Sequence, residues 1–278
     1  MINNKKKLRS LISYIFLLKN ILRKSGTSPS SGSYYFNIYS SHKEKLIQAG
    51  FDFPGETIGE FGPGDTLGVG ICALLDGFNK YIALDTIRHV NLNKNMQAYL
   101  EIVNFYNVNN DQIVSIENEL KNLPDGSKKI KYYVPWNLDN IIVENSTDLI
   151  ISNAVLEHVL DLDNIYKIMY KWLKPGGYIS HVIDYGAHEY SDNWYEHLYV
   201  SDSYWRFLMH GRMYPINRVS HSYHLNKISE AGFTILISER NKDTKADALK
   251  INKSICKFFN EDDLCTKSGL IIAQKRLF

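Results

Sequence analysis

A glycine-rich loop is the first segment of this chain whose residue types and spacing could do chemistry. Gly62 and Gly64 follow an apolar run at 57–61 and precede a helical pattern. Glycines at such a turn let the backbone approach a ligand, because a Cβ would collide with it or forbid positive φ. Asp85 ends the next apolar run, 21 residues after Gly64. A carboxylate there accepts hydrogen bonds from both hydroxyls of a ribose, so the pattern predicts a site for an adenosine-containing cofactor.

Glu60 indicates which adenosine cofactor the loop would bind. It precedes Gly62 by two residues, so its carboxylate belongs beside the loop. A dinucleotide site presents a helix N-terminus to a pyrophosphate and gains nothing from a neighbouring acid. A carboxylate suits a cationic ligand, and S-adenosylmethionine carries both an ammonium group and a sulfonium. We therefore expect S-adenosylmethionine as the cofactor.

The elements that would position these residues alternate along the chain. Apolar, β-rich runs stand at 57–61, 80–84, 131–134, 148–152, 178–183, 233–238 and 269–274. Helical patterns stand at 67–75, 92–104, 163–172 and 223–231. This alternation predicts a mostly parallel sheet with helices on both faces. Between about 185 and 222 it fails, and a segment rich in His, Trp, Tyr and Asp indicates an insertion near the ligand site.

Three later motifs, together with the glycine loop and Asp85, resemble the class I S-adenosylmethionine-dependent methyltransferases. The motifs are the segments 148–159 (DLIISNAVLEHV), 172–177 (WLKPGG) and 231–233 (AGF). The resemblance covers about residues 56–275, and it departs from the family pattern at Thr66, which stands where a third glycine is usual. It implies an α/β, Rossmann-like fold whose seven-stranded sheet is mostly parallel, with an antiparallel last strand.

The resemblance also implies which residues contact the cofactor. They are Glu60, Gly62, Gly64, Asp85, Trp136, Asn137, Asn153 and Ala154. The glycine loop would hold the methionine part and Asp85 the ribose. Trp136 falls where the family contacts adenine. Its indole either stacks on that ring, a contact worth about 1 kcal/mol, or packs in the protein core.

The candidate catalytic residues lie where the fifth predicted strand ends. Methyl transfer is an in-line displacement, so an enzyme mainly aligns the reactants and supplies a base for a hydroxyl acceptor. We expect Asp184 and His188 to orient or deprotonate the acceptor. His181 is a third candidate, although it fits a core histidine better than a base. A metal site made of these three residues is not favoured, and Glu157 with His158 is expected to shape a loop.

The insertion bears on the choice of acceptor. Its aromatic and polar residues include Trp194, Tyr195, His197, Trp205, His210, Arg218, His221 and His224. Aromatic faces beside His and Asp suit a sugar ring, and the insertion is similar to a subgroup of bacterial methyltransferases associated with surface-polysaccharide synthesis. O-methylation of a glycan or glycan precursor is therefore the favoured activity, with a small metabolite or a lipid as the alternative acceptor. The other interpretation is that these aromatics form a small core of their own.

Two other classes of function stay open from the residues. Tyr223 and Lys227 match the Tyr-x-x-x-Lys pattern of nicotinamide-dependent reductases, but Glu60 argues for a cationic ligand. A non-catalytic cofactor-binding module is the second class, and the intact Glu60, Gly62, Gly64 and Asp85 disfavour it.

Composition excludes several further classes. The chain has 278 residues, 44% hydrophobic and 13% aromatic, which is typical of a globular protein. Its three cysteines, Cys72, Cys256 and Cys265, show no metal-ligand spacing. They predict neither a disulfide framework nor a zinc site, and a reducing cytoplasm is the expected compartment.

Charge divides the chain into two parts. Residues 1–26 contain seven Lys and Arg and no acidic residue. Residues 27–278 contain the other 25 cations and all 30 acids, so their net charge is about −5. Residues 5–24 have the pattern of a basic amphipathic helix, which either lies on the inner face of a membrane or docks on protein. With the linker that follows, they predict two regions, 1–33 and 34–278. The acidic second region disfavours nucleic acid as a partner.

Overall fold

A seven-stranded sheet forms the centre of the computed structural model, which describes residues 31–123, 126–136 and 141–277. Its order is β3-β2-β1-β4-β5-β7-β6. The strands are β1 (Thr57–Phe61), β2 (Lys80–Leu84), β3 (Ile130–Tyr133), β4 (Thr147–Asn153), β5 (Leu173–Asp184), β6 (Phe233–Lys242) and β7 (Thr266–Lys275). The basic helix predicted at 5–24 and the cofactor contact predicted for Asn137 lie outside the described residues.

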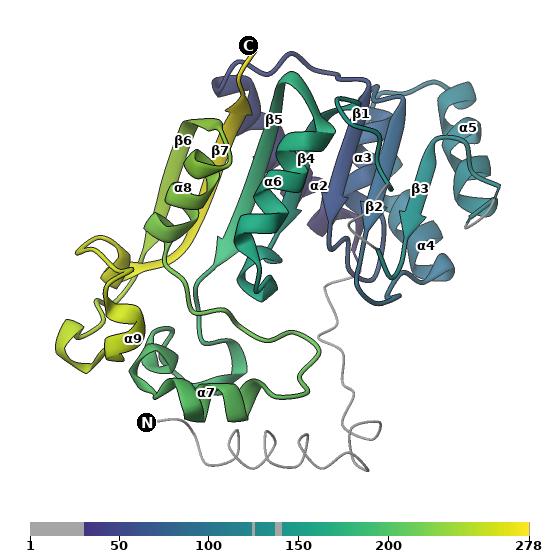
Figure 1. The fold of residues 1–278 in the computed structure, drawn as a ribbon. Helices are drawn as coiled ribbons and strands as arrows, with labels where there is room; N and C mark the ends of the chain where they lie inside the picture. Colours follow the sequence, from purple (N-terminus) through teal and green to yellow (C-terminus); the bar gives the residue numbers. More distant parts are fainter. Residues whose placement is uncertain (1–30, 124–125, 137–140, 278) are drawn as a thin grey trace.

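Strand direction confirms the predicted sheet. β1 to β5 pair in parallel, whereas β7 runs antiparallel to both of its neighbours, β5 and β6 (Figure 1). The fold is therefore the expected Rossmann-like α/β sheet with an antiparallel last strand. The carboxyl ends of the parallel strands meet at one edge, which is where ligands bind in such sheets.

Helices cover both faces of the sheet. They are α2 (Gly32–Gln48), α3 (Gly68–Leu75), α4 (Leu92–Val103), α5 (Asn110–Lys121), α6 (Leu162–Trp172), α7 (Asp202–Met209), α8 (His221–Glu230) and α9 (Lys253–Cys256). Side chains of α2 to α5 pack with Leu149 and Ile151 of β4 in one core cluster. Side chains of α6 and α8 pack with Ile150 in a second cluster on the other face (Figure 1). Successive strand residues thus point to opposite layers.

Four of the described helices, α2, α5, α7 and α9, are absent from the sequence prediction, and of these α2 and α5 pack in the core cluster that covers one face of the sheet. α2 begins at Gly32, two residues before the expected start of the domain, with Ser31 as its N-cap. Its first turn lies so close to α4 that a Cβ on Gly32 would approach the Cβ of Glu101 to 2.5 Å. α5 begins with a capping box between Asn109 and Gln112. α2 is only weakly amphipathic, so its apolar periodicity gives little indication of a helix.

The predicted insertion leaves the sheet after β5 and returns at α8. It carries two 3₁₀ turns, η3 (His188–Tyr190) and η4 (Glu196–Tyr199), and the helix α7. It lies beyond the carboxyl ends of the parallel strands (Figure 1). Within the described part of the chain, no helix is both long enough and apolar enough to cross a membrane.

Candidate active site

The glycine loop follows β1 directly and turns as predicted. Gly62 has φ +64° and Gly64 has φ +73°, the left-handed region that favours glycine. The N–H of Gly62 donates to the carbonyl of Leu84 at 2.8 Å. A Cβ on Gly62 would lie 2.5 Å from Cγ2 of Val155. The loop after β1 therefore touches the ends of β2 and β4, and a larger residue would disrupt this contact.

Glu60 is a buried carboxylate at the end of β1, with 6% of the residue exposed. It accepts a hydrogen bond from the hydroxyl of Tyr81 on the neighbouring strand β2. Burial and, to a smaller extent, the nearby Asp85 raise the pKa of Glu60 to about 8. A cationic ligand beside it would favour the ionised form and relieve this cost.

Asp85 follows β2 and organises the next part of the edge. Its Oδ1 accepts the N–H of Thr86 at 2.8 Å, and its carbonyl accepts the N–H of Trp136 at 3.0 Å. Burial raises the pKa of this carboxyl. Trp136 is half-buried and packs edge-on against Phe61, with ring centroids 5.0 Å apart. The structure thus brings Trp136 beside Asp85, and its ring also contacts the core.

Asn153 and Ala154 stand where β4 ends. Ala154 has φ +54°, and its N–H donates to the carbonyl of Val182 on β5 at 2.9 Å. A non-glycine residue in this conformation costs about 1 kcal/mol or more, so the sharp turn is held by its surroundings. The turn carries the chain to Val155, which contacts the glycine loop. The predicted cofactor residues that the structure describes therefore lie at adjoining strand ends.

The three candidate catalytic residues separate into two groups. Nε2 of His188 lies 3.6 Å from Oδ2 of Asp184, and both side chains are partly exposed. His181 is completely buried, and its Nδ1 lies 2.8 Å from the hydroxyl of Ser152. Burial lowers the pKa of His181 to about 3. The geometry brings Asp184 and His188 together at the sheet edge and places His181 in the core, apart from them.

Glu157 and His158 join this group, a neighbourhood that the sequence analysis did not predict. They form the 3₁₀ turn η2 (Leu156–His158), directly after β4. Oε1 of Glu157 lies 3.9 Å from Nε2 of His188. The rings of His158 and His188 have centroids 5.3 Å apart. Glu157 and His158 follow β4, and Asp184 and His188 lie at and after the end of β5, which is the parallel neighbour of β4. Because parallel strands end at a shared edge of the sheet, the positions of these residues after two successive predicted strands could have indicated that they lie close together.

The tryptophans of the insertion are buried, so they do not offer the sugar-binding faces that the sequence analysis expected. Trp194 is 8% exposed and Trp205 is 5% exposed. Nε1 of Trp205 donates to the carbonyl of Ile216 at 3.0 Å, and the guanidinium of Arg218 lies over its ring. Trp205 and its neighbours instead form a small hydrophobic core within the insertion, which is the other interpretation given in the sequence analysis.

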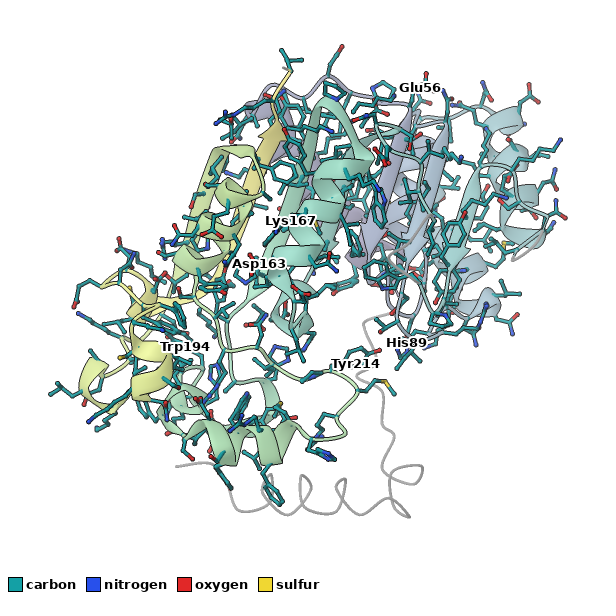
Figure 2. All side chains as sticks on the ribbon, viewed as in Figure 1. Glu56, His89, Asp163, Lys167, Trp194 and Tyr214 are labelled. Atoms are coloured by element: carbon teal, nitrogen blue, oxygen red, sulfur yellow. The ribbon has the colours of Figure 1, made fainter. Side chains whose placement is uncertain are left out.

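Tyr214 is the aromatic residue of the insertion that reaches the cofactor edge. It is 37% exposed, and its hydroxyl is hydrogen-bonded with Nε2 of His89 in the loop after β2. Its ring also lies 5.6 Å from the ring of His158. Figure 2 shows Tyr214 and His89 meeting below the carboxyl ends of the strands. The insertion thus spans from β5 to the loop that carries Asp85.

Comparison with known proteins agrees with this architecture. The chain matches the methyltransferase domain family over residues 52–265. A proposed sarcosine dimethylglycine methyltransferase from Galdieria sulphuraria has 13% identity and a TM-score of 0.54, covering 87% of this chain and 86% of its own. A geranyl diphosphate methyltransferase, solved with S-adenosylmethionine, has 12% identity and a TM-score of 0.51, with coverage of 91% and 93%.

No protein of curated function matches the sequence. The family match spans more than three quarters of the chain and includes the glycine loop, Asp85 and the turn after β4. It excludes the nicotinamide-dependent reductase, and Lys227 of that pattern is ion-paired with Asp163 and Glu230 instead. The chain belongs to the methyltransferase domain family and is an S-adenosylmethionine-dependent methyltransferase of the class I fold.

Proposed function

We propose that this methyltransferase methylates a hydroxyl oxygen of a glycan or glycan precursor, with Glu60, Asp85 and the glycine loop binding the cofactor. The observation that carries the cofactor assignment is the pair of buried carboxylates at the ends of adjacent strands. Glu60 and Asp85 lie within electrostatic reach of each other, and the close turn at Gly62 separates them. One carboxylate suits the ammonium group of the methionine part, and the other suits the ribose hydroxyls.

The hydrogen bonds at Asp85 support this assignment. Oδ1 is occupied by the N–H groups of Thr86 and Ile87. Among the described residues, no group donates to Oδ2, which leaves that oxygen for a ligand. Backbone donors thus fix the orientation of the carboxylate before the ribose binds, and such preorganisation reduces the entropy lost on binding.

The acceptor would lie beside Asp184 and His188. S-adenosylmethionine supplies an electrophilic methyl group on sulfur, and the acceptor oxygen forms its new bond to carbon as the carbon–sulfur bond breaks. The hydroxyl proton passes to Asp184 or His188, either of which would orient the oxygen for in-line attack. Asp184 ends β5 and His188 follows it, at the edge where the glycine loop and Ala154 lie.

The exposed ring of Tyr214 supports a sugar as the acceptor. It lies beside His158 and within electrostatic range of Asp85. A sugar presents axial hydrogens that stack on an aromatic face, while its hydroxyls bind to neighbouring polar side chains. The ring of Tyr214 is accessible for such stacking, whereas those of Trp194 and Trp205 are buried.

Transfer of labelled methyl groups tests the acceptor. The purified protein would be incubated with labelled S-adenosylmethionine and separate cell-envelope, small-metabolite, lipid, protein and nucleic-acid fractions. We expect label in the envelope glycans or their precursors, at a base-stable ether. Label in the metabolite or lipid fraction would replace the glycan with that acceptor class. Label in nucleic acid or protein alone would overturn the proposal of a glycan acceptor.

A further inference from the structure

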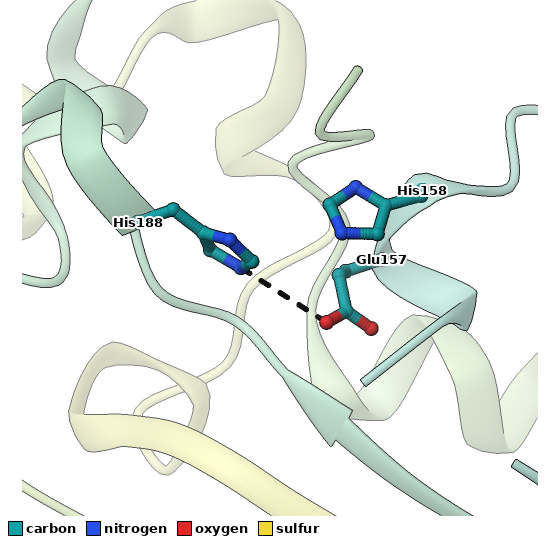
Figure 3. Close-up of side chains that lie close together, drawn as sticks. All are labelled: Glu157, His158 and His188. Carbon is teal, nitrogen blue, oxygen red and sulfur yellow. Dashed lines mark ion pairs between the residues drawn. The ribbon is translucent and has the colours of Figure 1, made fainter. Parts of the chain in front are cut away.

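Glu157, His158 and His188 form a compact cluster of metal-binding side chains. Each offers one ligand atom, and the three atoms lie within 4.8 Å of one another. Glu157 and His158 come from η2 after β4, and His188 begins η3 after β5. β4 and β5 are adjacent parallel strands, so both turns emerge at the same edge. Figure 3 shows the three side chains converging from these turns.

The buried carboxylate of Glu157 lacks a hydrogen-bond partner in the part of the chain that the structure describes. The residue is 1% exposed, and among the described residues neither carboxylate oxygen accepts a hydrogen bond of normal geometry, although the N–H groups of Glu157 and Asp184 lie near. Buried polar groups are nearly always paired, and an unpaired one costs about 1–3 kcal/mol. A ligand that binds both oxygens or one of them would remove this cost.

His158 is oriented as metal-binding histidines usually are. Its Nδ1 lies 3.2 Å from the carbonyl oxygen of Pro215, which accepts the ring N–H. The lone pair is therefore on Nε2, and Figure 3 shows that nitrogen turned toward Glu157 and His188. A backbone carbonyl that holds the far nitrogen fixes both tautomer and ring direction, a recurring feature of metal sites. Burial also lowers the pKa of His158 to about 4, so its ring is neutral.

His188 adopts a backbone conformation that few residues other than glycine use. Its φ is +49°, a conformation that costs about 1–3 kcal/mol and persists only where the surroundings enforce it. The turn before it is fixed by Asp184, whose Oδ1 accepts the N–H of Gly186 at 2.7 Å. The result directs Nε2 of His188 toward two carboxylates, Glu157 at 3.9 Å and Asp184 at 3.6 Å.

We propose that Glu157, His158 and His188 bind a divalent transition-metal ion, of which Zn²⁺ is the representative. Two imidazole nitrogens and one carboxylate suit Zn²⁺ and its neighbours in the first transition series, whereas Mg²⁺ and Ca²⁺ prefer oxygen ligands. In a bound site the ion would lie about 2.1 Å from each ligand atom, so the three ligand atoms would lie somewhat closer to one another than they do now. The metal set weighed from the sequence, His181 with Asp184 and His188, shares only His188 with this cluster.

The proposed role of the ion rests on the proposed function. A bound divalent ion has open positions beyond its three protein ligands, and one would take the acceptor oxygen. Coordination lowers the pKa of a hydroxyl, so its proton leaves more easily. With His188 bound to the ion, Asp184 is the group that remains to accept that proton. The ion would thus orient the acceptor and divide the roles of the two candidate catalytic residues.

Direct titration with Zn²⁺ and Co²⁺ tests the site without any enzymatic assay. The full chain, freed of metal by dialysis against a chelator, would be titrated by calorimetry, and Co²⁺ binding followed through its visible absorption. We expect about one ion per chain. Glu157→Gln and His188→Ala should each weaken binding by about tenfold or more. His210→Ala, a matched histidine change in the insertion outside the cluster, should leave the affinity unchanged.

Three outcomes would overturn the proposal: no binding by the wild-type chain, equal affinity in all three variants, or loss of binding in His210→Ala as well. Circular dichroism of each variant shows whether the fold is intact, and His188→Ala serves if Glu157→Gln does not fold, because His188 is partly exposed. Calorimetry with S-adenosylmethionine on the same metal-free protein separates the two proposals. If the protein binds the cofactor but no metal, only the proposed metal site is refuted. If it binds the metal but not the cofactor, only the proposed function is refuted.

Discussion

The hydroxyl of Tyr214 is hydrogen-bonded with Nε2 of His89, although 125 residues separate them in the chain. His89 belongs to the loop after β2 that begins with Asp85, and Tyr214 belongs to the insertion after β5. Burial, with smaller contributions from Asp85 and nearby groups, raises the pKa of Tyr214 to about 12, so the phenol stays protonated. This contact joins the insertion to the cofactor edge, and we expect it to slow cofactor exchange.

Tyr214→Phe should therefore speed the release of S-adenosylmethionine. Loss of one hydrogen bond worth about 1 kcal/mol corresponds to a dissociation rate about fivefold higher. Stopped-flow tryptophan fluorescence measures this rate. Tyr204→Phe in α7 is the matched control, because it removes a hydroxyl from the same insertion away from His89. Equal dissociation rates in wild type and Tyr214→Phe would show that the contact does not control release.

Asp85→Ala should weaken the binding of S-adenosylmethionine by at least about tenfold. The variant removes a carboxylate that would bind two ribose hydroxyls, and hydrogen bonds to a charged group are worth about 1.5–3 kcal/mol each. Asp52→Ala, which removes an exposed carboxylate just before β1, serves as the control. Isothermal titration calorimetry compares the three proteins. An unchanged affinity in Asp85→Ala would take Asp85 out of the ribose site.

The cofactor edge could be predicted from the sequence because its geometry is local. Glu60 and Gly62 are two residues apart, and Asp85 directly follows β2, the strand that pairs with β1. A parallel sheet brings such strand ends together whatever the connecting helices do. The same reasoning located every strand, with differences in length. β5 begins at Leu173 instead of Tyr178, because Leu173 pairs with Thr147 before the ladder resumes at Leu149.

The acceptor side depends on the path of the insertion, which has no repeating pattern. Whether Trp205 is a binding surface or a core residue is decided by the fold of 185–222, and the composition of that segment fits both. The convergence of His188 with Glu157 requires a positive φ at a histidine, which residue type does not predict. The pairing of His89 with Tyr214 is likewise a long-range contact between two loops.

Cofactor affinity should rise with pH up to the pKa of Glu60. In the free protein this carboxyl has a pKa of about 8, mainly because it is buried. Below that pH it is protonated, and binding of the ammonium group would require loss of the proton. The affinity should therefore increase by up to about tenfold per pH unit below pH 8 and level off above it. Of the other titratable groups near Glu60, burial raises the pKa of Tyr81, Tyr35, Cys72 and Asp85.

Calorimetry in buffers of different ionisation enthalpy measures the proton released on binding. We expect up to one proton per cofactor at pH 7 in the wild type and less in Glu60→Gln, which has no group to titrate there. Glu56→Gln, which changes an exposed carboxyl at the other end of β1, is the control and should match the wild type. Proton release that is the same in Glu60→Gln would assign it to another group.

Acid should destabilise the fold through its buried histidines. Burial lowers the pKa to about 4 for His42 and His221 and to about 3 for His181, His197 and His224. Below the unfolded value of about 6.5, the unfolded chain binds protons that the folded chain excludes. Each histidine therefore lowers the free energy of unfolding by up to about 1.4 kcal/mol per pH unit between its two pKa values.

Three buried carboxyls, those of Glu60, Glu157 and Asp85, act in the opposite direction because burial raises their pKa, and the histidines outnumber them. The pKa of Glu60 and that of Glu157 are raised to about 8, so these groups favour the fold as pH falls from 8 toward 4.5. The balance predicts a stability maximum near neutrality and a loss between pH 6 and pH 4.5. Urea denaturation across this range measures the free energy of unfolding at each pH.

His42→Gln, which keeps a polar atom near Ser180, should reduce the slope of the free energy of unfolding against pH by about one proton, or about 1.4 kcal/mol per pH unit. A slope that His42→Gln leaves unchanged would show that protonation of this histidine does not drive acid unfolding.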